Sequence, residues 1–153
     1  MRVLIQRVKR ASVTVSGELV SEIGKGLLVF VGICDDDGKE DIEWLTKKIS
    51  NIRLFDDENG VMNLSVQETG GEVLAVSQFT LMASTKKGNR PSFINAMEPI
   101  TAEKYYKAFC EALNNYGVKQ VQTGEFGADM QVSLINDGPV TINLDTDIWN
   151  KKG

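Results

Sequence analysis

The order of apolar and polar residues predicts that the chain opens with β-structure. Val3–Val8 is predicted to form a strand with Arg7 near its end. Ser12–Ser16 alternates with a period of two, and Gly17 then marks a turn. Leu27–Ile33 is a continuous apolar run rich in β-branched residues, which is typical of a buried strand.

Two later segments have the spacing of helices. In the first, apolar residues recur every three or four positions and so share one helix face: Ile42, Leu45, Ile49 and Ile52. Asp37 followed by Glu40 predicts a capping box at its start. The second helix is expected to begin near Thr101, after Pro99, and to end at Gly117. Its apolar face is formed by Tyr105, Phe109, Ala112, Leu113 and Tyr116.

The rest of the pattern is β-structure. Glu72–Ser77 is predicted to be a strand, and Met130–Ile135 alternates before Gly138-Pro139 is expected to break the run. Val140–Leu144 then resumes it. We therefore expect an α/β fold: one β-rich domain over residues 1–153, with two main helices packed on a sheet or barrel-like core.

Composition narrows the possible functions. The formal net charge is −4, so a nucleic-acid partner would need a local basic patch. No apolar run approaches membrane-spanning length, and the N-terminal residues lack a signal-peptide pattern. We expect no membrane association and a cytoplasmic location.

The chain contains no histidine, which removes the side chain most often used as a base near neutral pH. Its two cysteines, Cys34 and Cys110, form no disulfide framework and have no metal-ligand spacing. We expect no bound metal and no cofactor. A hydroxyl nucleophile would need a lysine, a carboxylate or the substrate itself as its base.

Ser77, Gln78, Phe79 and Thr80 follow a predicted strand, where side chains commonly face a site held by a rigid scaffold. Two hydroxyls and an amide are available, and backbone N–H groups in such a turn can stabilise a developing oxyanion. Taken without further context, the same four residues also suit an ordinary polar loop.

Three cations, Lys86, Lys87 and Arg90, lie close to Gly88 and Pro91 in a predicted loop. This composition suits contacts with phosphates, although a solvated surface loop has the same charge pattern.

The Asn136-Asp137-Gly138-Pro139 segment predicts a turn between two strands from its residues alone. A cis Gly-Pro bond there would present two carbonyl oxygens side by side. The segment Gly124–Met130 also suits a structural turn, and Phe126 or Met130 would line any pocket near the Gly-Pro turn.

Four segments together resemble the D-aminoacyl-tRNA deacylase family in order and spacing: Met1–Val8, Ser77–Leu81, Lys87–Phe93 and Asp129–Thr141. The resemblance implies a compact α/β domain that forms a homodimer with its sites at the interface. It also implies that tRNA is the partner, bound through Lys86, Lys87 and Arg90, and that the reaction is hydrolysis of the D-aminoacyl ester.

The resemblance assigns roles to single residues. Ser77–Thr80 would line the pocket for the aminoacylated adenosine. Gly138-Pro139 of the other subunit would enter that pocket with a cis bond and capture the α-amino group of a D-amino acid. Asn136 and Met130 would take part in this selection, and Arg7 would hold the motif in place.

The implied chemistry uses water, assisted by the 2′-hydroxyl of the terminal adenosine, with N–H groups near Phe79 and Thr80 as the oxyanion hole. Thr80 as a nucleophile ranks lower, because nothing near it in sequence would deprotonate it. Glycyl-tRNA is a further expected substrate, since glycine has no side chain to exclude. Three alternatives remain: a relative that edits another mischarged tRNA through a trans Gly-Pro, a module that binds tRNA ends without hydrolysis, and a hydrolase of small D-amino-acid esters.

Overall fold

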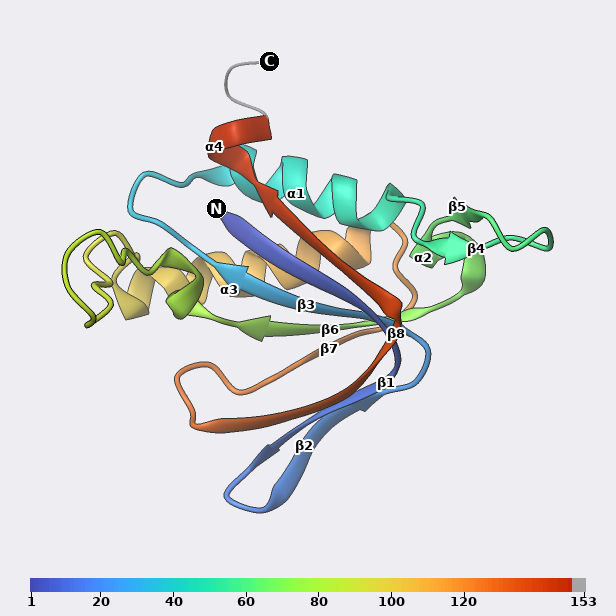
Figure 1. Cartoon of the computed structure of the whole chain (residues 1–153), viewed down its shortest axis with the longest axis horizontal. Coiled ribbons are helices and arrows are strands. Elements are labelled where there is room, and N and C mark those ends of the chain that lie inside the picture. Colours follow the sequence, from blue (N-terminus) through green and yellow to red (C-terminus); the bar gives the residue numbers. More distant parts are fainter. Residues whose placement is uncertain (150–153) are drawn as a thin grey trace.

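Two long helices lie on one face of a strongly curved six-stranded sheet (Figure 1). The computed structural model describes residues 1–149. Its strands are β1 (Arg2–Val15), β2 (Glu18–Ile23), β3 (Gly26–Gly32), β4 (Phe55–Asp56), β5 (Met62–Leu64), β6 (Glu72–Ser77), β7 (Val121–Thr123) and β8 (Met130–Asp145). Its helices are α1 (Lys39–Asn51), α2 (Val66–Thr69), the 3₁₀ helix η1 (Phe79–Met82), α3 (Pro99–Asn115) and α4 (Thr146–Trp149). The predicted α/β class with two main helices is confirmed.

Strand β1 is the centre of the sheet. Its first half, Arg2–Val8, pairs with β3, and its second half, Ala11–Val15, pairs with β2. Strand β8 pairs with both halves, and all these pairings are antiparallel. On the other side, β3, β6 and β7 are parallel. A single strand thus replaces the two separate strands predicted for the N-terminal segment.

Strand β3 is buried on both faces, as its continuous apolar run predicted, and β6 is buried in the same way. Leu27 and Val29 of β3 contact the core beneath helices α1 and α3, whereas Leu28 belongs to a second core inside the curl of the sheet. Val73 and Leu74 of β6 divide in the same way. Because successive side chains of a strand point to opposite faces, these strands separate the two cores.

Helix α1 forms where the spacing predicted it, but the capping box is wrong in its residues. Gly38 is the N-cap, and its N–H donates to the Asp41 carboxylate at 2.8 Å. Asp37 instead accepts a hydrogen bond from the N-terminal ammonium of Met1 and, at 2.7 Å, from the Cys34 N–H. A long-range ion pair therefore displaces the local cap that the sequence pattern favoured.

The predicted break at Gly138-Pro139 is also wrong, because β8 continues through these residues. Between the pairs Gln6↔Thr141 and Val8↔Asn136, the register advances by two residues on β1 and by five on β8. The additional residues of β8 form a bulge, a feature that bends a strand and redirects its side chains. Gly138-Pro139 therefore lies in a bulge of one strand and not in a turn between two.

No helix in the described part of the chain is long and apolar enough to cross a membrane.

The packing of α3 on β6 yields a stability prediction. The buried Tyr106 hydroxyl donates to the Ala75 carbonyl at 2.6 Å, and burial raises the pKa of Tyr106, so the hydroxyl stays protonated. Tyr106→Phe should lower the free energy of unfolding by about 1–2 kcal/mol, because it leaves a buried carbonyl without its donor. Urea unfolding followed by circular dichroism measures this, with Tyr105→Phe as the control at a less buried hydroxyl. Equal effects of the two changes would contradict the prediction.

Candidate functional site

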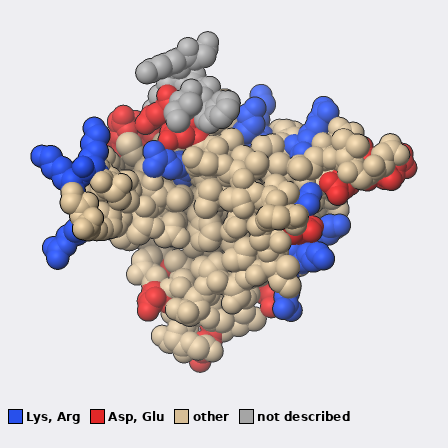
Figure 2. Space-filling model, in the orientation of Figure 1, with Lys and Arg blue, Asp and Glu red and all other residues tan. Residues whose placement is uncertain are grey.

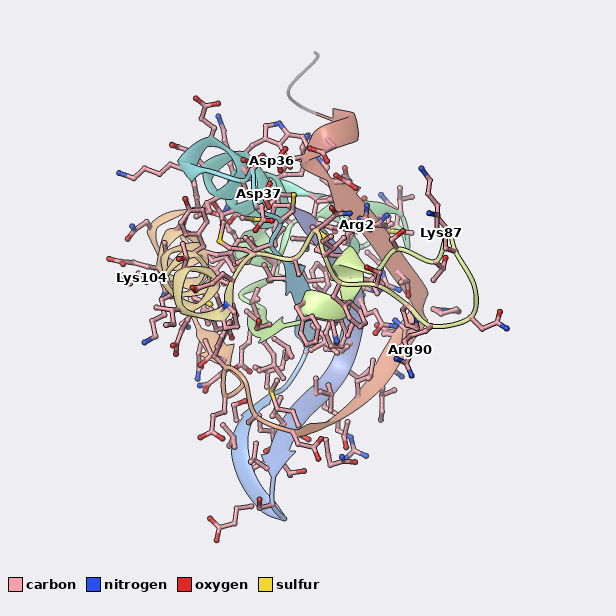
Figure 3. All side chains as sticks on the ribbon, turned by 90° about the vertical axis from the view of Figure 1, so that its left-hand side faces the viewer. Arg2, Asp36, Asp37, Lys87, Arg90 and Lys104 are labelled. Atoms are coloured by element: carbon pink, nitrogen blue, oxygen red, sulfur yellow. The ribbon has the colours of Figure 1, made fainter. Side chains whose placement is uncertain are left out.

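A pocket of about 520 Å³ opens at the C-terminal end of β6, on the side that faces the viewer in Figure 3. One wall is formed by Ser77, Gln78 and Phe79, as the predicted site required. Thr80 is exposed and lies outside the set of lining residues. The structure thus places three of the four predicted catalytic residues at one cavity, with the fourth next to it.

The remaining walls come from segments far apart in the sequence. Phe93, Met97 and Glu98 precede α3, and residues 126–130 contribute from the connection between β7 and β8 and from the first residue of β8. The Glu98 carboxylate accepts the Thr101 N–H at 2.9 Å and so caps α3 beside the pocket. Sequence reasoning did not single out Met97 or Glu98, because only the packing of α3 on the sheet brings them here.

Two aromatic rings stand at the pocket. Phe79 and Phe93 are in edge-to-face contact with centroids 5.0 Å apart, and Phe79 keeps 56% of its surface exposed. An exposed aromatic ring at a pocket is a surface on which a planar group, such as a nucleic-acid base, can stack.

The Thr80 hydroxyl accepts a hydrogen bond from the side-chain amide of Gln78. Within the described residues, no lysine or carboxylate hydrogen-bonds to this hydroxyl. A hydroxyl without an adjacent base is a weak nucleophile. The local geometry therefore favours a binding or positioning role for Thr80.

Residues 84–92 form a basic loop, which projects from the side of the molecule on which the pocket opens. Ser84 and Ser92 close its base with two backbone hydrogen bonds of 2.8 and 2.9 Å. Lys86, Lys87 and Arg90 lie between them and are exposed, and Lys87 points away from the body of the protein (Figure 3). Figure 2 shows the corresponding group of cations at the left edge of the molecule.

Gly138 and Pro139 are exposed in the bulge of β8, and the peptide bond between them is cis. Arg7 is 8% exposed and donates to the Asp137 carbonyl at 3.1 Å and to the Leu54 carbonyl at 2.7 Å. The Asn136 side-chain amide donates to the carbonyls of Arg7 and Val140, both at 3.0 Å.

Gly138 is required by its backbone and by its surroundings. Its φ of +130° is one that L side chains rarely adopt. A Cβ atom there would lie 2.8 Å from Val140 Cγ2 and 3.1 Å from Arg7 Nη2. Any side chain at this position would therefore displace the bulge from Arg7.

The Gly-Pro bulge lies beside the middle of β1, whereas η1, at the wall of the pocket, is held from the first residue of β1. Arg2 donates to the Leu81 carbonyl of η1, whereas Arg7 donates to the bulge. The two arginines are five positions apart along the strand, which corresponds to about 16 Å. Figure 1 shows the arrowhead of β6 toward the left end of the sheet and the bend of β8 toward the right end.

Phe126 and Met130 lie at the pocket and not beside the Gly-Pro segment of the same chain. Both residues line the pocket with Ser77, while Arg7, Asn136, Gly138 and Pro139 do not. The curl of the sheet explains this, because β8 begins at the pocket and reaches its bulge only at the far end of the molecule.

A polar cluster beside the N-terminus brings together the Cys34 sulfur and the carboxylates of Asp36 and Asp37. The Cys34 thiol donates to Asp36 at 2.6 Å, and burial raises the pKa of the thiol to about 11. Asp37 is occupied by the ammonium of Met1, which also donates to the Thr146 hydroxyl at 2.8 Å. The thiol is thus protonated near neutral pH, and the cluster anchors the start of β1.

Comparisons with known proteins agree on one family. The model of the D-Tyr-tRNA(Tyr) deacylase family matches residues 4–145. This chain belongs to that family. It is similar to proteins named D-aminoacyl-tRNA deacylase from Parabacteroides distasonis, with 64% identity over 95% of this chain and 97% of the relative, and from Bacteroides thetaiotaomicron, with 59% identity over the same shares.

Solved structures have the same fold at moderate and at low sequence identity. A structure titled c-Myc DNA Unwinding Element Binding Protein has a TM-score of 0.90 and 46% identity, and the match covers 95% of this chain and 98% of that one. A structure titled as a probable eukaryotic D-amino acid tRNA deacylase has a TM-score of 0.82 at 16% identity, covering 94% and 97% of the two chains. The second likeness concerns the fold alone.

Proposed function

We propose that this protein hydrolyses the ester bond of D-aminoacyl-tRNA and releases the free D-amino acid and tRNA. The observation that carries the proposal is the pocket at the end of β6, lined by the Ser77-Gln78-Phe79 part of the family signature. Family membership and the names of the similar bacterial proteins support the same reaction.

In this proposal the pocket receives the aminoacylated terminal adenosine. The ring of Phe79 gives the base a stacking surface, and the cations of the basic loop contact phosphates of the acceptor end. A net charge of −4 suits short encounters with tRNA better than stable binding, because affinity for nucleic acids depends on neutralised phosphates.

We further propose a homodimer in which each Gly138-Pro139 bulge enters the partner's pocket. The bulge is exposed and rigidly held, and it lies about 16 Å along β1 from the contact of its own chain with η1. Its carbonyl oxygens would accept hydrogen bonds from the substrate α-amino group. An L-amino acid would have to place its side chain where these oxygens lie, so specificity arises by exclusion.

The proposed chemistry needs no side-chain base. Water attacks the ester carbonyl with assistance from the neighbouring 2′-hydroxyl of the adenosine. The first N–H groups of a helix have no intrahelical acceptor, so those of Phe79 and Thr80 at the start of η1 are candidates for binding the oxyanion. Glycyl-tRNA is a further proposed substrate, because glycine presents only hydrogen where L side chains are excluded.

Hydrolysis of D-Tyr-tRNA and L-Tyr-tRNA, measured in parallel against a no-enzyme control, tests the function. We expect rapid loss of the D ester, with the L ester at its spontaneous rate. A variant in which Lys86, Lys87 and Arg90 are alanine should lose activity on tRNA but keep any activity on D-tyrosine methyl ester. If the variant hydrolyses both the tRNA ester and the methyl ester at the wild-type rate, the result would favour a small-ester hydrolase. If the wild-type protein hydrolyses neither D-Tyr-tRNA nor L-Tyr-tRNA, the result would favour a binding module.

Gly138→Ala tests the chiral filter. The new Cβ has no room beside Val140 and Arg7, so we expect the ratio of D-Tyr-tRNA to L-Tyr-tRNA hydrolysis to fall at least about tenfold, equivalent to about 1.4 kcal/mol. Gly17→Ala is the matched control, because Gly17 also has a positive φ but a Cβ added there would have no atom within 4 Å. An unchanged ratio in folded Gly138→Ala protein would contradict exclusion by the bulge.

Thr80→Val separates substrate assistance from nucleophilic catalysis. Because no lysine or carboxylate among residues 1–149 hydrogen-bonds to the Thr80 hydroxyl, kcat for D-Tyr-tRNA should stay within about threefold of the wild-type value. Single-turnover kinetics measures the chemical step directly. A loss of about four orders of magnitude would identify Thr80 as the nucleophile instead.

A further inference from the structure

The segment Ser77–Phe79 forms a pocket wall, yet only its first residue belongs to the sheet. The Gln78 N–H donates to the Val31 carbonyl at 2.8 Å, which fixes the point where the chain leaves β6. Beyond that point the chain turns into η1, where the Leu81 N–H donates to the Gln78 carbonyl at 3.1 Å. The depth and angle of this wall therefore depend on what η1 rests against.

Gly32, the last residue of β3, lies directly under η1. A Cβ atom on Gly32 would be 2.9 Å from Leu81 Cβ and 3.1 Å from the Gln78 carbonyl oxygen. The φ of Gly32 lies outside the positive range, so space and not backbone conformation calls for glycine here. A methyl group at this position would push η1 away from the sheet.

Arg2 holds η1 from the neighbouring strand, directly opposite Gly32 in the β1–β3 ladder. Its Nη1 donates to the Leu81 carbonyl at 2.6 Å, and its Nε donates to the Asp145 carboxylate at 2.9 Å. Asp145 is 5% exposed, and its other oxygen accepts the Asp147 N–H at 3.0 Å. The guanidinium is thus fixed at one end by a buried carboxylate and reaches η1 with the other.

We propose that Gly32 and Arg2 are positioning residues that set the place of the Ser77–Phe79 wall relative to the pocket. Gly32 lets η1 approach the sheet, and Arg2 draws it down onto the sheet. The inference rests on the proposed deacylase function, and it assigns neither residue any contact with the substrate. Displacements of about 1 Å in an active site can lower a rate about 100-fold, so a single methyl group at Gly32 suffices for a large effect.

Steady-state and single-turnover kinetics on D-Tyr-tRNA test this with Gly32→Ala, Arg2→Met and Arg2→Lys. We expect Gly32→Ala and Arg2→Met to lower kcat about 100-fold with KM within about threefold, the pattern of lost positioning and not of lost binding. Arg2→Lys should recover about tenfold over Arg2→Met, because an ammonium can still donate to the Leu81 carbonyl. The kcat of the double variant Gly32→Ala/Arg2→Met should be no lower than that of the less active single variant, because both changes act on the same element, η1.

The controls are Gly24→Ala, where the nearest atom to a new Cβ is 3.5 Å away, and Arg53→Met, an arginine whose hydrogen bond to Asn63 is exposed. Both should keep wild-type kcat. Thermal unfolding of every variant identifies proteins that are folded at the assay temperature. If Gly32→Ala does not fold, the comparison of Arg2→Met with Arg2→Lys decides.

The outcomes are distinct. Wild-type protein that leaves D-Tyr-tRNA intact overturns the proposed function and the positioning role with it. Active wild type with wild-type kcat in folded Gly32→Ala and Arg2→Met overturns the positioning role alone. A higher KM with unchanged kcat in Arg2→Met also overturns it, because Arg2 would then bind tRNA directly.

Discussion

The pairing of strand β1 with three other strands is the constraint on which both functional regions depend. The strand pairs with β3 and then β2 along one edge, and with β8 along the other, so it cannot shift without breaking several ladders. Arg2 contacts η1 beside the pocket, and Arg7 contacts the Gly-Pro bulge. The spacing between the two regions is therefore set by backbone hydrogen bonds, whatever the side chains around them.

Arg7 shows how a buried charge can hold a strand bulge in place. Its side chain donates to two backbone carbonyls and lies 3.5 Å from carboxylate oxygens of both Asp56 and Asp137. Removing a partner from a buried charge is strongly unfavourable, so the bulge cannot leave Arg7 at low cost. Carbonyl groups held in this way suit selection by exclusion, which requires fixed atoms and not particular side chains.

The sequence predicted the elements whose signals are local. The three- and four-residue spacing of Ile42, Leu45 and Ile49 located α1, and the apolar run from Leu27 located a strand that the helices and the curled sheet cover on opposite faces. It failed where partners are distant. Asp37 does not cap α1 because the N-terminal ammonium binds it.

The candidate site was also predicted only in part from the sequence. The residues of the family signatures were identifiable, and Ser77, Gln78 and Phe79 do line one pocket. The position of Met130 in that pocket, and the distance of Arg7 and Gly138 from it, follow from the curl of the sheet and from the register shift in β8. No pattern within a few residues records either feature, so residue patterns alone did not predict the division; only the family resemblance placed the Gly-Pro segment at another subunit's pocket.

A chain without histidine can still promote ester hydrolysis if positioning supplies most of the catalysis. The Gln78 side-chain amide donates a hydrogen bond to the Thr80 hydroxyl, and no lysine or carboxylate of the described residues hydrogen-bonds to this hydroxyl. What remains is a wall of backbone and side-chain dipoles, and such groups lower a barrier only when they are already aimed at the developing charge. The tight contact of Gly32 with η1 and the buried carboxylate that binds Arg2 are consistent with this requirement for fixed groups. Both restrict the movement of a segment whose contribution to the proposed reaction depends on its position.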